Sequence, residues 1–375
     1  MKASNGFSFS RWWSMVLKEF LQLRRDRLTF AMIVGIPIAQ LVLFGFAINN
    51  DPRHLPTAVI SADHSEFTRS FIAAMRSSTY FDLVGELPDE AAGRTALARG
   101  TVQFVLNIPA GFTERLLRGE RPALLIEADA TDPGTTGMAL ASAGQLVRAV
   151  AAKDLAGSLS FLAGTPDPFE VRIHRLYNPE GITRYNIIPG LIGVILCMTM
   201  VLMTGLAITR ERERGTMENM LAMPVSPFEV MTGKLVPYIA IGLLQTTIIL
   251  LAARFLFQVP SAGSLSMIYL AALLFVVANL TVGIALSSVA QNQLQAMQMT
   301  LFYFLPNMIL SGFMFPFQGM PHWAQHIGNF LPLTHFLRLI RGIILKGNPF
   351  PDLWPSIWPL MVFTDSSTSL VICVS

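Results

Sequence analysis

The chain has 375 residues, of which 52% are hydrophobic and 14% are charged. Soluble domains carry about 25% charged residues, so this composition excludes an ordinary soluble protein and predicts an integral membrane protein. The net charge of +3 does not indicate a nucleic-acid partner, and Cys197 and Cys373 lack the spacing of a metal site or a disulfide framework.

Residues 1–27 are predicted to form a cytoplasmic amphipathic helix that lies flat in the membrane interface. One half of this helix is apolar and carries Trp12, Trp13 and Phe20, and the other half is polar. Residues 28–48 follow as an apolar run of roughly 31 Å, long enough to cross a bilayer as the first transmembrane helix. A cleaved signal peptide is the alternative, but the run is too long for a typical signal sequence.

Residues 49–186 have shorter apolar runs and more Pro, Gly and charged residues, which predicts a separate domain. Strands are expected at 57–60, 101–106, 124–127 and 169–176, and helices at 65–76, 88–99, 111–118 and 134–162. This alternation predicts an extracytoplasmic α/β domain inserted between transmembrane helices 1 and 2. Its histidines, His54, His64 and His174, lack metal-ligand spacing, which favours a binding or docking domain over an enzyme.

The remaining sequence predicts five further transmembrane helices, six in total. They are expected at 187–208, 235–256, 265–290, 296–316 and 354–375. The last is incomplete or atypical because a polar stretch from Asp365 to Ser369 interrupts it, and a central Asp costs about 2.5–3.5 kcal/mol on insertion scales. Residues 317–353 form the segment between the fifth and sixth helices.

Basic residues give the orientation of these helices. They cluster before the first helix and within residues 209–234, which places both segments and the N-terminus in the cytoplasm. Residues 49–186 and 317–353 are then extracytoplasmic.

The predicted helices 2 to 5 contain no Asp, Glu, Lys, Arg or His apart from Arg254 at the end of the third, where it can reach the interface, and this argues against an ion-driven carrier. Their polar residues are uncharged, and four of them are candidates for a translocation path: Thr204, Gln245, Asn279 and Asn307. The sequence also lacks a phosphate-binding loop, since Gly233-Lys234-Leu235 departs from that motif at both ends. Energy must therefore arrive through a partner at the cytoplasmic face.

The stretch 210–227 is a dense charge run between two apolar helices. Met217, Met220 and Leu221 stand at helical spacing and form one apolar face, and Pro224 and Pro227 are predicted to end the helix. This pattern favours a helix that a partner protein binds. A solvated loop that only orients its neighbours is the alternative.

The sequence resembles the permease subunits of type-2 ABC exporters. The likeness rests on the order of the elements and on two groups of motifs. The first group lies after the second predicted transmembrane helix: Glu213-Arg214-Gly215-Thr216-Met217-Glu218, then Pro224-Val225-Ser226 and Gly233-Lys234. The second group lies between the fifth and sixth: Pro321-His322-Trp323, Leu331-Pro332-Leu333-Thr334-His335, Arg338 and Arg341-Gly342. The resemblance implies that 211–224 is a coupling helix seated in a separate ATPase subunit, through Arg212, Glu213, Gly215, Thr216, Met217, Glu218, Met220, Leu221 and Pro224. It also implies an exit-side segment that uses Pro332, Thr334, His335 and Arg341.

The resemblance implies a permease that exports an amphiphilic small molecule, drug, lipid or ion and has no catalytic residue of its own. ATP and Mg would bind to the partner ATPase subunit and no cofactor or metal to this chain. The expected partners are that ATPase, a second permease copy (the same or a similar chain), membrane lipid and a periplasmic adaptor, in a bacterial cytoplasmic (inner) membrane. The main alternative is a membrane-anchored extracytoplasmic binding or scaffold protein without transport activity.

Overall fold

The computed structural model describes residues 53–78, 80–154, 169–213 and 227–374. The predicted interfacial helix 1–27, the first transmembrane helix 28–48 and most of the predicted coupling helix lie outside the described residues.

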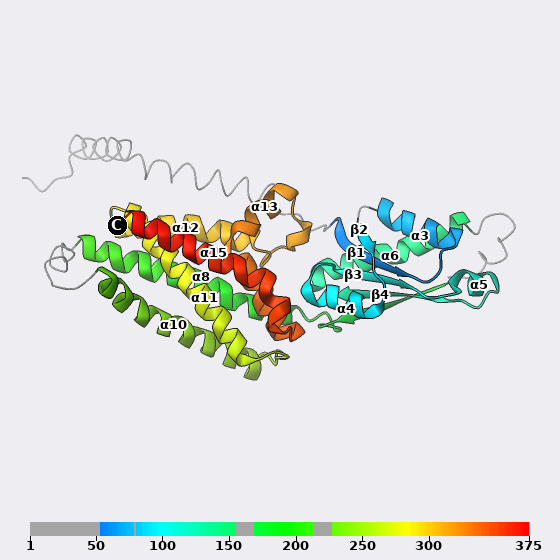
Figure 1. Cartoon of the computed structure of the whole chain (residues 1–375), viewed down its shortest axis with the longest axis horizontal. Coiled ribbons are helices and arrows are strands. Elements are labelled where there is room, and N and C mark those ends of the chain that lie inside the picture. Colours follow the sequence, from blue (N-terminus) through cyan, green and yellow to red (C-terminus); the bar gives the residue numbers. More distant parts are fainter. Residues whose placement is uncertain (1–52, 79, 155–168, 214–226, 375) are drawn as a thin grey trace, which may run out of the picture.

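A five-stranded mixed sheet forms the first described part of the chain (Figure 1). Its strand order is β2-β1-β3-β4-β5; β1 is parallel to β2 and β3, and β4 is antiparallel to β3 and parallel to β5. The strands are β1 (Leu55–Ser61), β2 (Phe81–Glu86), β3 (Phe104–Ile108), β4 (Ala123–Asp129) and β5 (Glu170–Leu176). The helices between them are α3 (Glu66–Ser77), α4 (Glu90–Arg99), α5 (Phe112–Leu117) and α6 (Pro133–Asp154).

Helices cover both faces of this sheet. On one face, side chains of α3, α5 and α6 pack with the strands into a core in which Phe71 and Phe112 both contact the edge of Phe169, at ring-centroid distances of 5.8 and 5.6 Å. On the other face, Leu97 of α4 packs against Ala58 and Val105. Each aromatic pair of this kind adds about 0.5–1.5 kcal/mol beyond the area that it buries.

Two helices of this α/β domain, α3 and α4, begin with a side-chain cap. The Ser65 side chain accepts a hydrogen bond from the Thr68 amide at the start of α3, and Asp89 does the same for Ala92 at the start of α4. Gly100, with φ of 72°, ends α4 in the left-handed conformation. Strand β2 was not predicted from the sequence, because Asp82 and Gly85 interrupt its apolar alternation.

The second described part is a bundle of helices (Figure 1). Three of them are long and apolar enough to cross a membrane among the residues that the structure describes: α8 (Thr183–Glu213), α10 (Pro227–Phe255, apolar from Leu235) and α11 (Leu265–Val289). The other elements are α12 (Gln293–Leu310), the short η3 (Phe317–Gly319), α13 (His322–Phe330), α14 (Pro332–Arg341), the π-helix η4 (Gly342–Lys346) and α15 (Phe350–Val374). α12 packs against α8, and α15 against α11 and α14.

Several helix ends differ from the sequence prediction. α8 extends to Glu213, beyond the predicted 208, and α10 begins at Pro227, before the predicted 235; proline suits a first helical position because that position needs no N–H donor. α12 ends at Leu310, before the predicted 316, because Gly312 adopts a positive φ of 86° and turns the chain back. α15 continues as a helix to Val374 through the polar stretch at 365–369.

Glycines allow the bundle helices to approach closely. Cβ atoms added at Gly190 and Gly193 of α8 would lie 2.7 Å from ring atoms of Phe313 and Phe336, respectively. A Cβ added at Gly283 of α11 would lie 2.9 Å from the Val201 carbonyl oxygen of α8. The contact between α8 and α11 is therefore a backbone-to-backbone contact, a packing mode typical of membrane helices.

The α/β domain lies at one end of the bundle, and α8 runs from there to the opposite end (Figure 1). A short turn connects β5 to α8; in it the Asn178 side chain accepts a hydrogen bond from the Ile182 amide and donates one to its carbonyl, both at 3.0 Å. With 31 residues, α8 is about 46 Å long, enough for the hydrocarbon core and both interfaces. A membrane crossed by α8 therefore separates the α/β domain from Glu213.

Candidate functional site

The end of α8 farthest from the α/β domain is bound to the turn between α11 and α12. The Glu213 carboxylate accepts hydrogen bonds from the backbone N–H of Gln293, at 2.8 Å, and from the Gln293 side-chain amide. The neighbouring Arg212 donates from Nη1 to the carbonyl oxygen of Ser288, in the last turn of α11, at 3.3 Å. A carboxylate at the first residue of α12 is favourable, because the N-terminal end of a helix carries partial positive charge.

This contact determines which helices would move together with the end of α8. Because Arg212 contacts α11 and Glu213 contacts α12, a displacement of the end of α8 also acts on α11 and α12. The family resemblance implies that Glu213 contacts an ATPase, and neither Gln293 nor Ser288 was predicted from the sequence. No local pattern indicated them, since Gln293 lies 80 residues from Glu213 in the chain.

The other predicted coupling residues lie outside the described part of the structure. They are Gly215, Thr216, Met217, Glu218, Met220, Leu221 and Pro224. Their role as a partner-binding helix stays a prediction from the sequence.

The predicted exit-side residues form the corner between α13 and α14. Pro332 is the buried first residue of α14, and the hydroxyl of the fully buried Thr334 donates to the Gly328 carbonyl oxygen at 2.6 Å. His335 Nε2 lies 2.8 Å from the carbonyl oxygen of Asn329. Thr334 and His335 therefore bond the end of α13 to the start of α14.

Arg341 lies at the opposite end of α14 and bonds two other elements. Its Nη2 donates to Asn186 Oδ1 at 2.8 Å, and its Nη1 donates to the Gly312 carbonyl oxygen at 3.2 Å. The Asn186 amide in turn donates to the Thr131 carbonyl oxygen at 2.7 Å. One guanidinium thus joins α14 to the start of α8 and to the turn after α12, and Asn186 continues the connection into the α/β domain.

The four candidate path residues are placed on four helices of the bundle. Thr204, Asn279 and Asn307 are at most 2% exposed, and the amides of Asn279 and Asn307 donate to carbonyl oxygens one turn earlier in their own helices. Gln245 is half-buried and accepts a hydrogen bond from Thr199 at 2.9 Å. Thr204 packs against Gly283, so it lies at a close contact between α8 and α11.

Comparison with known proteins supports a transporter subunit. Residues 27–364 match the ABC-2 family transporter protein family. The chain is 26% identical to the probable multidrug ABC transporter permease YbhR of Escherichia coli K12, over 96% of this chain and 97% of that protein. It is also 28% identical to the probable multidrug ABC transporter permease YbhS of the same organism, over 91% of this chain and 90% of that protein.

More distant similarity reaches beyond bacteria. ABC transporter G family member 20 of Dictyostelium discoideum is 23% identical over 88% of this chain and 45% of that protein. These relatives do not favour the alternative of a membrane-anchored scaffold. The family match over most of the chain, together with the apolar helices of the bundle, shows that the chain belongs to the ABC-2 transporter family as a membrane permease.

Proposed function

We propose that this chain is the permease subunit of an ATP-driven exporter in the bacterial inner membrane and that a separate ATPase subunit drives it through residues 211–224. The observation that carries the proposal is the hydrogen bonding of Glu213 and Arg212 to the turn between α11 and α12. A displacement of the segment after Glu213 would move three helices together. Such an arrangement transmits force from a partner without an ionisable residue inside the membrane.

The proposed transport cycle assigns different tasks to the two ends of the bundle. ATP and Mg bind to the partner subunit, whose closure displaces the segment that follows α8. The displacement reaches α11 and α12 through Arg212 and Glu213. The exit-side corner around Thr334 and His335 forms the outward end of the bundle. Two permease copies and two ATPase copies form the working unit, and the α/β domain lies outside the cytoplasm, where it docks an adaptor protein.

We also propose amphiphilic drug-like cargo. The printed names of YbhR and YbhS support this class, since both are described as probable multidrug permeases. The bundle offers Met, Phe and uncharged polar side chains such as Gln245 and Thr199, which suit varied amphiphiles better than ions.

Copurification of the ATPase tests the proposed drive. The full chain is affinity-purified from cells that express the ATPase subunit, and ATP hydrolysis in the eluate is measured. We expect Gly215→Pro and Glu218→Ala to lower the recovered ATPase activity at least about tenfold, because both would remove central contacts of an interface. Glu180→Ala, an exposed change at the other end of α8, serves as the control and should recover wild-type activity.

We expect a different result for Glu213→Ala, because the Glu213 carboxylate already accepts hydrogen bonds from Gln293 of the same chain. This variant should still recover the ATPase and should lose ATP-driven export of ethidium into inverted vesicles. Full ATPase recovery with Gly215→Pro would show that the coupling segment is wrongly assigned.

A further inference from the structure

The π-helix η4 lies where the bundle meets the α/β domain. The Ala262 amide of the α10–α11 loop donates to the Ile344 carbonyl oxygen of η4 at 2.9 Å. The neighbouring Gly263 approaches η4 so closely that an added Cβ would lie 2.3 Å from the Ile343 carbonyl oxygen. π-Helical turns are rare and occur frequently at functional sites, and this one presents its last residue, Lys346, to the domain.

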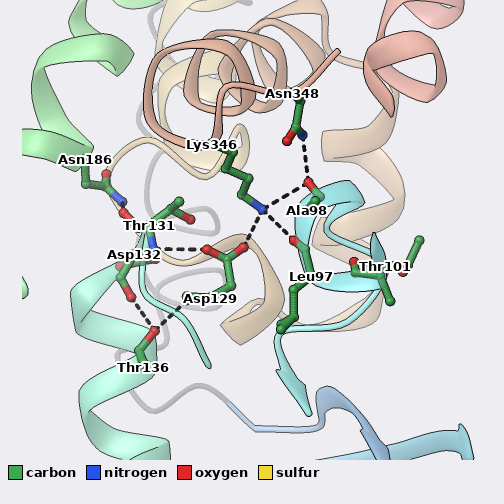
Figure 2. Close-up of polar contacts among 11 residues, drawn as sticks. Leu97, Ala98, Thr101, Asp129, Thr131, Asp132, Thr136, Asn186, Lys346 and Asn348 are labelled. Carbon is green, nitrogen blue, oxygen red and sulfur yellow. Dashed lines mark hydrogen bonds and ion pairs between the residues drawn. The ribbon is translucent and has the colours of Figure 1, made fainter. Parts of the chain in front are cut away.

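Lys346 forms a buried connection to the domain (Figure 2). Its Nζ donates to Asp129 Oδ2 at 2.6 Å and to the Leu97 carbonyl oxygen at 2.9 Å, with the Ala98 carbonyl oxygen at 3.5 Å. The two side chains of the ion pair are only 8% and 9% exposed. A cation at the last turn of α4 also interacts favourably with the negative end of that helix.

The ring of Tyr177 lies beside this ion pair. The ammonium lies 5.2 Å from the ring centre of Tyr177, and burial together with the carboxylates of Asp129 and Glu127 raises the pKa of Tyr177 to about 12. A buried charge whose partner is removed is strongly unfavourable, whereas a fully bonded pair is tolerated. Lys346 and Asp129 therefore depend on each other across the boundary between bundle and domain.

Two further contacts surround the pair on the same face of α4. The Asn348 side-chain amide donates to the Ala98 carbonyl oxygen at 2.7 Å (Figure 2). Arg99 Nε donates to Asp352 Oδ1 at 2.6 Å. Lys346 and Asn348 thus donate to the Leu97 and Ala98 carbonyl oxygens in the last turn of α4, and Asp352 of α15 pairs with Arg99, the last residue of α4.

From these contacts we infer that Lys346 is a positioning residue that fastens the α/β domain to η4, so that the domain and the exit-side helices α14 and α15 move as one body during transport. The fastening itself is independent of the proposed function. Its consequence for transport rests on that function.

Hydrogen exchange in the full-length chain tests the fastening without any partner. Lys346→Met should raise amide exchange in 97–104 and 343–352 about tenfold, because the joint opens more often once Asp129 and the α4 carbonyl groups lose their donor. Arg94→Met is the matched control, since Arg94 is exposed on the same helix and reaches only Glu90 at 4.0 Å. Exchange in Lys346→Met equal to that in wild type would overturn the inference.

A double-mutant cycle separates the pair from general destabilisation. Asp129→Leu should raise exchange in the same segments, and Lys346→Met/Asp129→Leu should raise it less than the product of the two single effects, because no unpaired charge is left buried. Multiplicative effects would show that the two residues do not act as a pair.

The expected effect of Lys346 on transport is measured separately from the amide exchange. In vesicles that contain the complete complex, Lys346→Met should keep ATP hydrolysis within about twofold of wild type and reduce ethidium export about tenfold, while Arg94→Met changes neither. Unchanged export together with faster exchange would overturn the coupled movement. Absence of ATP-driven ethidium export by the wild-type complex would instead contradict the proposed function or its cargo class and leave the exchange result standing.

Discussion

Gly283→Ala is expected to destabilise the bundle by about 1–3 kcal/mol, the usual cost of inserting a methyl group into a filled contact. The added Cβ would lie 2.9 Å from both the Val201 carbonyl oxygen and the Thr204 Cβ, and 3.3 Å from the Val201 Cα. Two of these three atoms belong to the backbone, so no side-chain rotation relieves the clash, and α8 and α11 must move apart. Because α8 carries the end that contacts α12, we expect export to fall as well.

The matched control for this change is Gly205→Ala on the facing helix. A Cβ at Gly205 would meet Thr300 Oγ1 at 3.7 Å and the Gly283 carbonyl oxygen at 3.8 Å, both ordinary van der Waals distances. The measurement is the thermal unfolding midpoint of the purified chain in detergent. Equal midpoints for the two variants would contradict the tight contact assigned to Gly283.

Arg341→Met is expected to have a comparable or larger effect. The change removes the donor from two acceptors, Asn186 Oδ1 and the Gly312 carbonyl oxygen, and each buried acceptor left without a donor costs about 1–3 kcal/mol. Asn186 would then hold Thr131 of the domain without support from α14. We expect a lower unfolding midpoint and faster amide exchange at the start of α8.

Two variants control for the loss of charge and of side-chain volume. Arg184→Met alters an exposed arginine near Asn186 and should leave the midpoint unchanged. Arg341→Lys keeps the charge but not the planar fork of donors, so an intermediate midpoint is expected. A wild-type midpoint in Arg341→Met would show that the network does not contribute to stability.

Periodicity and capping residues predicted much of the fold. The long apolar runs of α8 and α11, and the helix starts at Ser65 and Asp89, could be read from local sequence because each depends on neighbours within one or two turns. β2 could not be predicted, because it is held in the sheet by pairing with β1 and not by its own composition. The early end of α12 depends on the conformation of Gly312, which only the tertiary structure determines.

The residues that connect the α/β domain to the helix bundle were harder to predict than the helices and strands themselves. Lys346 and Asp129 are separated by 217 residues, and each alone resembles an ordinary surface charge in sequence. Arg341 and His335 were singled out only by resemblance to a family, and the structure gives both a structural contact that the resemblance did not describe. The coupling residues from Gly215 to Pro224 lie outside the described residues and keep the status of a prediction.

Labelling of single cysteines tests the central claim most directly, since an ATPase in the cytoplasm can drive this permease only if the end of α8 is cytoplasmic. Arg212→Cys and Arg94→Cys are introduced separately into a chain with Cys197→Ala and Cys373→Ser and treated with a membrane-impermeant maleimide. In intact spheroplasts we expect labelling of the Arg94→Cys variant alone, and in inverted vesicles labelling of the Arg212→Cys variant alone. Labelling of Arg212→Cys in intact spheroplasts would place the end of α8 outside the cytoplasm and contradict the account.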